Sequence, residues 1–247
     1  MPSGIQSLNG LRAEVYMNKF VLAFPIPVAE TEDFKISDVV SVSAEAATLL
    51  VPGCNVRFDV VRKPALPTLS EIFREHNEIS AEEAATIDAH RSLLFLISTL
   101  KSADDLSMVN SAILKMFTAG AAGVYMQQSG TAWTAGAFRE ELGDAEFPMD
   151  PWINFVESAD LLYTLGLEVF GLPDLSISHS IGSAEELKNI LAVVADTIFV
   201  DGVSSKSGTE VDAGDSGVFV LRSETKSPFS KDSPEFNRQG IMRLSKK

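Results

Sequence analysis

The stretch Tyr163–Ile177, YTLGLEVFGLPDLSI, decides how the second half of the chain is interpreted. Its apolar residues alternate as they do in a β-strand, yet it contains two glycines and a proline. Gly166 and Gly171 supply backbone conformations or close approaches that a β-carbon would prevent, and Pro173 ends strand pairing on its edge. We therefore expect a buried, bulged strand that turns a corner. A binding site formed at the bulge is the alternative, because bulges re-aim side chains.

The composition is that of a soluble globular protein. The chain has 247 residues, 45% of them hydrophobic and 22% charged, and a net charge of −14. No apolar run reaches the roughly 18 to 20 residues that a membrane helix needs, so we expect no membrane partner. The acidic charge also argues against nucleic acid, since phosphate contacts need clustered cations.

The termini and the single cysteine bear on where the protein works. Residues 1–18 lack the pattern of an export signal and are expected to form a flexible N-terminal extension. Cys54 is the only cysteine, which excludes an intramolecular disulfide and a multi-cysteine metal site. These features favour a reducing, cytoplasmic location. Cys54 lies in a Pro-Gly-Cys-Asn turn with no flanking base, so the turn predicts no nucleophile.

Periodicity and capping signals predict alternating strands and helices. Strands are expected at 19–24, 46–51, 55–62, 93–100, 123–127, 153–157, 218–222 and 241–244, and helices at 69–76, 80–89, 102–119, 135–142 and 183–200. Two helices begin with a capping box, Ser80 to Glu83 and Ser183 to Glu186. The strands at 93–100 and 123–127 flank a helix, so they should be parallel with a right-handed crossover.

These elements predict an α+β fold, a mixed β-sheet with helices mainly on one side. Residues 19–247 are expected to form a single domain. An alternative is a division into halves at 19–79 and 80–247, arranged as a duplicated ferredoxin-like unit.

Several short motifs together resemble one known family. They are the Tyr163–Ile177 stretch, Gly123-Val124-Tyr125, Pro151-Trp152, the segment PALP at 64–67, and the closing Ser227-Pro228-Phe229 and Met242-Arg243-Leu244. From about Phe20 onward the chain resembles a bacterial family designated domain of unknown function 4261. The resemblance implies a fold but no established activity and no catalytic residues. Met126-Gln127-Gln128 departs from the family pattern after Tyr125.

The sequence predicts no catalytic, cofactor or metal site. Gly214–Gly217 spells GDSG, as around the nucleophile of some serine proteases, but a polar turn entering a strand explains it better. The three histidines, His76, His90 and His179, never recur at metal-binding spacing. His90 follows Asp88 by two residues at a helix end, where it complements the helix dipole. Its alternative role is the general base of an uncharacterised hydrolase.

An acidic region with aromatic residues is the best candidate binding surface. The acids of 138–168, opposed only by Arg139, are Glu140, Glu141, Asp144, Glu146, Asp150, Glu157, Asp160 and Glu168. The candidate binding residues are His90, Tyr125, Trp133, Trp152, Tyr163 and Thr164. These features predict a non-catalytic interaction protein with a basic protein partner, such as a toxin-neutralising or accessory factor. A homodimer formed through an exposed sheet edge is a further alternative.

Overall fold

The computed structural model describes residues 19–144, 147–224, 229–231 and 236–247. By its contacts the chain forms two compact units, the first made mainly of residues up to 144 and the second mainly of residues 145–247. Short pieces at 101–103 and 128–130 belong to the second unit. This division lies near residue 145. The sequence predicted a single domain, with halves at 19–79 and 80–247 as the alternative.

The first unit is built on a six-stranded sheet whose neighbouring strands all pair antiparallel. Its strands, in spatial order, are β4 (Thr48–Leu50), β5 (Arg57–Pro64), β6 (Ser92–Ser98), β1 (Phe20–Ile26), β7 (Gly123–Met126) and β8 (Thr131–Thr134). Both β6 and β7 pair antiparallel with β1, so they run in the same direction, as predicted, with β1 between them. The strands β2 (Phe34–Lys35) and β3 (Ser41–Val42) form a separate pair.

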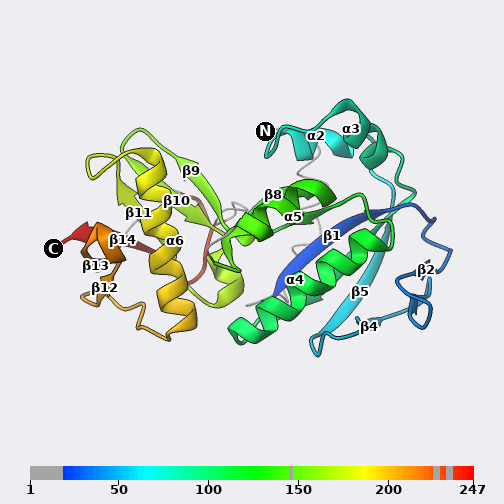
Figure 1. Cartoon of the computed structure of the whole chain (residues 1–247), viewed down its shortest axis with the longest axis horizontal. Helices are drawn as coiled ribbons and strands as arrows, with labels where there is room; N and C mark the ends of the chain where they lie inside the picture. The colour runs from blue at the N-terminus through cyan, green and yellow to red at the C-terminus, as the bar shows by residue number, and fades with distance from the viewer. Residues whose placement is uncertain (1–18, 145–146, 225–228, 232–235) are drawn as a thin grey trace. The chain divides into compact units, whose positions relative to one another are not determined.

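Helices cover both faces of this sheet. Successive side chains of β1 point to opposite faces, so each face of this strand contacts different helices. Val21 and Ala23 lie in one apolar cluster with Phe73 of α2 (Leu69–Arg74) and Ile87 of α3 (Ala81–Asp88). On the other face, the ring of Phe24 contacts Phe117 of α4 (Ala103–Thr118). Phe117 also contacts Phe138 of α5 (Ala135–Asp144), and Figure 1 shows α4 and α5 side by side.

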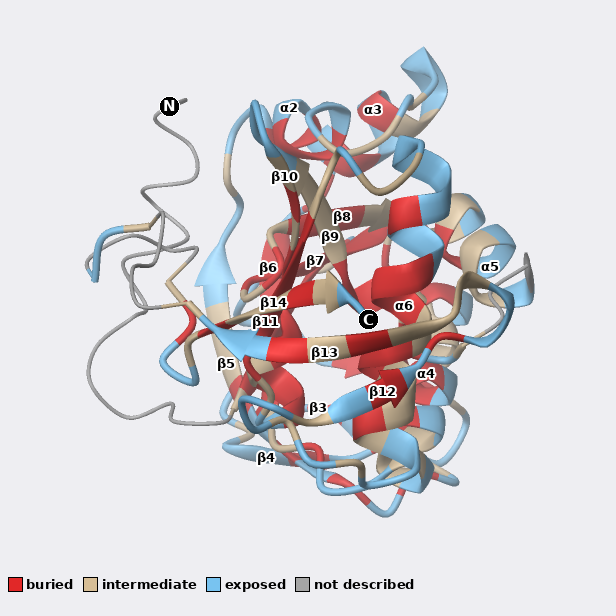
Figure 2. Cartoon of the chain, turned by 90° about the vertical axis from the view of Figure 1, so that its left-hand side faces the viewer, coloured by how far each residue is buried: buried red, intermediate tan, exposed pale blue. Residues whose placement is uncertain are grey.

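The second unit contains a mixed six-stranded sheet and one long helix. Its strands, in spatial order, are β12 (Glu210–Asp212), β13 (Val218–Ser223), β14 (Ile241–Lys246), β11 (Asp174–Ser178), β10 (Leu161–Leu165) and β9 (Asn154–Glu157). Among the described strands of this sheet, only β11 and β14 pair in parallel. Helix α6 (Ala184–Val200) packs against β10 and β11 through its buried stripe, which Figure 2 shows in red.

The α+β class predicted from the sequence is confirmed. In place of one mixed sheet, the chain has two separate six-stranded sheets. Their strand orders differ, so the two units are not copies of one topology. The expectation that helices lie mainly on one side of the sheet fits the second unit. In the first unit, helices cover both faces of the sheet. No helix in the described ranges is both long enough and apolar enough to cross a membrane.

The Tyr163–Ile177 stretch is a joint between two strands, which corrects the expectation of one bulged strand. Strand β10 ends at Leu165, a 3-10 turn spans Leu167–Phe170, and β11 begins at Asp174 and pairs antiparallel with β10. Gly166 and Gly171 flank the turn with φ of 107° and 71°, in the left-handed region that favours glycine. The glycines reverse the chain.

Both predicted capping boxes are present. The hydroxyl of Ser80 accepts from the main-chain nitrogen of Glu83, and the Glu83 carboxylate accepts from that of Ser80. Ser183 and Glu186 make the same reciprocal pair at the start of α6. The backbone hydrogen bond lowers the pKa of each glutamate.

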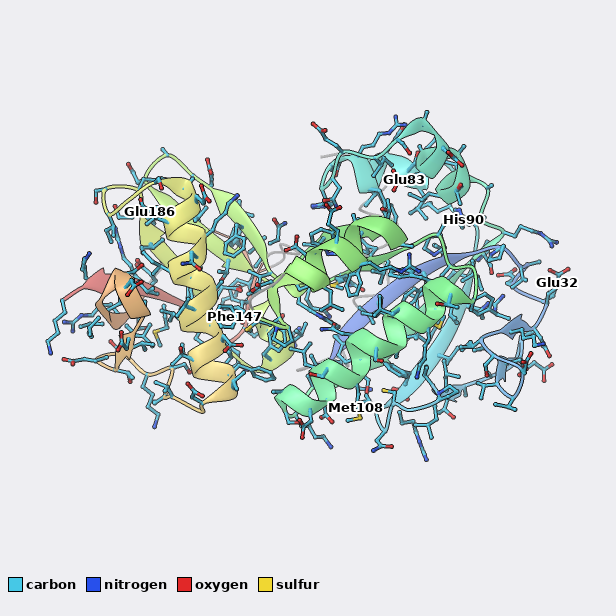
Figure 3. All side chains as sticks on the ribbon, in the orientation of Figure 1. Glu32, Glu83, His90, Met108, Phe147 and Glu186 are labelled. Carbon is cyan, nitrogen blue, oxygen red and sulfur yellow. The ribbon has the colours of Figure 1, made fainter. Side chains whose placement is uncertain are left out.

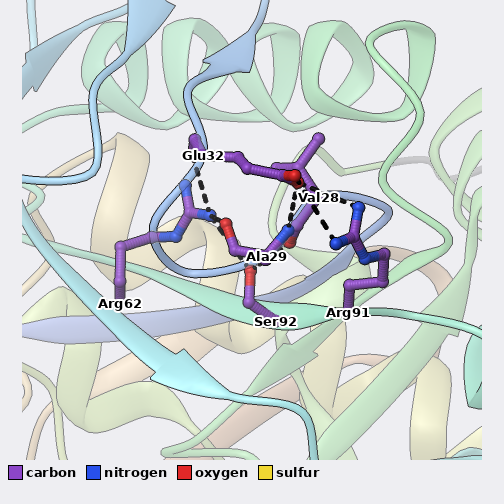
Figure 4. A network of polar contacts seen from close by, with 6 residues as sticks. All are labelled: Val28, Ala29, Glu32, Arg62, Arg91 and Ser92. Atoms are coloured by element: carbon purple, nitrogen blue, oxygen red, sulfur yellow. Dashed lines mark hydrogen bonds and ion pairs between the residues drawn. The ribbon is translucent and has the colours of Figure 1, made fainter.

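A polar network holds the loop after β1, and two arginines approach it from opposite sides (Figure 4). Nη2 of Arg62 donates to the carbonyl of Ala29 at 2.8 Å and to the hydroxyl of Ser92 at 3.0 Å. Arg91 pairs with Glu32 at 2.9 Å. Burial lowers the pKa of Arg62, and its Nε and Nη1 are buried with no hydrogen-bond partner in the described part of the chain.

Candidate functional site

The surface around α2 and α3 of the first unit begins at a backbone constraint. Strand β5 ends at Pro64, and the chain then passes through Thr68, which has a φ of 58°. A β-branched residue rarely adopts this left-handed conformation. Thr68 is the N-cap residue of α2, but its side chain makes no capping hydrogen bond.

Asp88, at the end of α3, supplies the missing cap. Its Oδ1 accepts from the main-chain nitrogen of Ser70 at 2.9 Å, and its Oδ2 accepts from the Ser70 hydroxyl at 2.7 Å. The first turn of α2 has unpaired N–H groups, and a carboxylate there is favourable. The Asp88 side chain therefore joins α3 to the start of α2.

His90 makes a second tie to the same segment. Its Nε2 accepts from the main-chain nitrogen of Leu66 at 3.0 Å, which leaves Nδ1 to donate to the carbonyl of Ile87 at 2.7 Å. The residue is 6% exposed, and burial lowers the pKa of its imidazole. Both ring nitrogens of the neutral histidine are thus used by the main chain. Figure 3 shows His90 beyond the end of α3.

A depression of about 390 Å³ opens beside α3. One wall is the helix itself, and the opposite wall is the turn between α4 and β7. The floor is the end of β1. Its lining residues are Pro25, Ile26, Pro27, Glu82, Ala85, Thr86, Ala89, His90, Gly120 and Ala122. We call this depression the α3 groove.

Acidic residues are frequent on α2, α3 and the turn between them, and one of them, Glu82, lines the α3 groove. Between residues 71 and 88 the acids are Glu71, Glu75, Glu78, Glu82, Glu83 and Asp88, with Arg74 as the opposing cation. We call these residues the α2–α3 acidic surface. A second, more open depression of about 570 Å³ is lined by residues 74–79 of the same segment. In the sequence, the longer acidic stretch of 138–168 drew attention away from this surface because it contains eight acids.

The acids of 138–168 do not belong to one structural unit. Those on α5 are in the first unit, whereas Glu157, Asp160 and Glu168 are in the second. Glu146 lies outside the described residues. The sequence therefore grouped side chains that are neighbours along the chain but are shared between two separately folded parts.

The predicted aromatic and hydroxyl candidates are likewise distributed over both units. In the first unit, Tyr125 is 5% exposed in the apolar cluster of α2 and α3, and Trp133 is half-buried on β8. In the second unit, Trp152 is buried and its ring contacts Phe170, while Tyr163 contacts Phe229. Thr164 is fully buried, and its hydroxyl accepts from the main-chain nitrogen of Leu175 at 2.8 Å. Tyr125, Trp152 and Thr164 are therefore buried inside their units.

Asp174 is a buried carboxyl that no sequence motif marks. Its Oδ1 accepts from the main-chain nitrogen of Leu167 at 3.2 Å, and the side chains of Asn237 and Thr164 also hydrogen-bond to it. Burial raises its pKa to about 8. Asn237 in turn donates to the carbonyl of Leu172 at 3.0 Å. Asp174 thus fastens both sides of the turn between β10 and β11.

Cys54 and the GDSG segment have structural roles in the described chain. The thiol is 2% exposed, contacts the carbonyl of Val56, and has a pKa raised by burial. Gly214–Ser216 is a 3-10 turn that leads into β13, as the turn interpretation predicted. No group of three or more potential metal ligands gathers among the residues that the structure describes.

No protein-family model, no curated protein and no solved structure matches the chain. The resemblance to the family designated domain of unknown function 4261 accordingly stays a prediction.

Proposed function

We propose that this chain is a non-catalytic binding protein that captures a basic protein partner. The observation that carries the proposal is the α2–α3 acidic surface, on which four exposed acids oppose Arg74 while Glu83 and Asp88 cap the starts of α3 and α2. The four are Glu71, Glu75, Glu78 and Glu82. A surface of one sign attracts and orients a partner of the opposite sign. A factor that neutralises a basic toxin, or an accessory protein of a basic enzyme, has these properties.

The non-catalytic part of the proposal is supported by what the reactive groups do. His90 gives both ring nitrogens to the main chain, Asp174 fastens a turn, and the Cys54 thiol is buried with a raised pKa. A general base or nucleophile needs a free atom within reach of substrate. We therefore do not favour the alternative of a hydrolase that uses His90.

A cytoplasmic location and a partner other than nucleic acid or membrane belong to the same proposal. A buried reduced cysteine is compatible with a reducing compartment. The net charge of −14 disfavours anionic polymers and anionic lipid surfaces.

The test is capture of a partner by the immobilised full chain at low and at high salt. We expect the immobilised chain to capture a basic protein at about 50 mM salt and to release it at about 500 mM, because screening weakens exposed charge pairs. The double variant Glu75→Lys/Glu78→Lys should lose it. The control Asp160→Lys/Asp215→Lys changes the charge equally in the second unit and should retain it. The proposal fails if no basic protein binds at low salt, or if both double variants lose it equally.

A further inference from the structure

The α3 groove owes its space to small side chains on both walls. Glu82, Ala85, Thr86 and Ala89 are spaced by three and four residues, so they lie along one side of α3. Gly120 and Ala122 form the facing wall above the Pro25–Pro27 floor. The alanines of the lining end at the β-carbon and Gly120 has no side chain, so these positions leave the groove open.

The polar side chains that line the groove offer acceptors. The hydroxyl of Thr86 donates to the carbonyl of Glu82 at 2.9 Å, which leaves its lone pairs as acceptors. Glu82 adds a carboxylate in the first turn of α3. His90 has no free ring nitrogen and contributes the surface of its ring. An occupant must therefore donate hydrogen bonds, and a positive charge suits it best.

The size of the groove limits what can enter it. A volume of about 390 Å³ is near the lower end of the roughly 300–1,000 Å³ typical of ligand pockets. It suits one or two side chains, and not a whole helix or strand. The apolar floor and walls suit the methylene stem of a long cation, whose charged end can reach Glu82.

We propose that the α3 groove binds a lysine or arginine side chain of the basic partner, together with a small aliphatic residue beside it. This inference rests on the proposed function, and it adds the point at which the partner is held. The α2–α3 acidic surface attracts the partner, and the groove selects a cation attached to an apolar stem.

The test uses a defined probe, a fluorescein-labelled dodecapeptide with three lysines separated by alanine and leucine. Its controls are the same peptide with glutamate in place of lysine, and a lysine peptide with glycine in place of the aliphatic residues. Fluorescence anisotropy with the full chain should show binding of the first peptide only. Binding should weaken as salt rises.

Matched variants locate the binding. Glu82→Lys and Glu71→Lys each reverse one first-turn acid, but only Glu82 lines the groove. Ala85→Leu fills the groove, whereas Ala81→Leu adds the same bulk at an exposed position of α3 that does not line it. We expect Glu82→Lys and Ala85→Leu to weaken binding at least about fivefold and both controls to change it less than about twofold. Glu82→Gln removes the charge with little change in shape. Weaker binding by this variant therefore cannot be attributed to misfolding.

Three results would overturn the inference. An equal loss with Glu71→Lys and Glu82→Lys would mean diffuse attraction, which removes the groove but leaves the proposed function in place. A dimer in light scattering that Glu82→Lys dissociates would assign the groove to a second copy of the chain. Absence of peptide binding at low salt would also reject the groove, and the capture experiment then decides separately whether the proposed function survives.

Discussion

The main-chain nitrogen of Leu167 lies 3.2 Å from Oδ1 of Asp174, across the turn that the two flanking glycines create. Burial holds the pKa of this carboxyl at about 8, against 3.8 for an unperturbed aspartate. Between these two values the folded protein keeps a proton that the unfolded chain has lost. The stability contributed by the neutral acid is therefore present at low pH and is lost as pH rises toward 8.

Asp174→Asn should remove this pH dependence, because asparagine resembles the neutral acid in shape and does not ionise. We expect the free energy of unfolding of the natural chain to fall relative to that of the variant between pH 5 and pH 8, by at most about 1.4 kcal/mol per pH unit. Urea unfolding at several pH values measures the free energy of unfolding of both proteins. Parallel curves for the two proteins would contradict a buried neutral Asp174.

His90 should produce a pH effect of the opposite sign. Its pKa is lowered by burial below 6.5, so the unfolded chain binds a proton before the folded protein does. Stability is therefore full above about pH 6.5 and is lost as pH falls. His90→Gln should reduce this loss. The pKa of His76 is also lowered by burial, so part of the dependence of stability on pH should remain in every variant.

Asp88→Ala should destabilise the chain by about 1.5–3 kcal/mol, since it removes a charged acceptor from two donors of Ser70. The exposed first-turn residue Asp104 offers a control, and Asp104→Ala should cost less than about 1 kcal/mol. Urea unfolding measures both. Equal losses would show that the Asp88 tie contributes nothing particular.

The two glycines of the turn should respond differently to alanine. A β-carbon on Gly171 meets nothing within 4 Å, so Gly171→Ala should cost only the left-handed conformation, about 1–2 kcal/mol. A β-carbon on Gly166 would lie 2.4 Å from the carbonyl oxygen of Trp152 and 2.7 Å from Cβ of Ser129. Gly166→Ala should therefore cost at least about 3 kcal/mol. Similar losses for the two variants would remove the packing argument.

Cys54 should react with a thiol reagent only after unfolding. It is buried, and burial raises the pKa of its thiol, so little thiolate reaches solvent. Ellman's reagent should modify the native chain slowly and the urea-unfolded chain at once. Rapid labelling of the native chain would show that this turn opens and would reopen the question of a reactive thiol.

Local signals were the most informative part of the sequence. The capping boxes at Ser80 and Ser183 involve residues three apart, and both helices begin where they predict. The helix expected at 102–119 is α4, and Leu106, Val109 and Ile113, spaced by three and four residues, are buried on it. These features depend on helical geometry alone, which a few residues determine.

Features that depend on distant partners were missed. Strand β8, with the sequence TAWT, is short and is defined by its pairing with β7, which no local pattern reveals. A carboxyl such as Asp174 looks like any surface acid in a sequence, and only its three donors distinguish it. Its position directly before Leu175-Ser176-Ile177, where apolar residues alternate as in a strand, was the one available signal. The α3 groove joins β1, α3 and the turn after α4, and no periodicity connects those segments.

The central place of β1 has a consequence for how the protein is made. Its ladders run to β6 on one side and to Tyr125 and Met126 of β7 on the other. During translation, both edges of this apolar strand remain unpaired until those later segments leave the ribosome. The nascent chain therefore exposes this apolar strand over that interval, and the risk of aggregation should fall once β7 has emerged and both edges can pair.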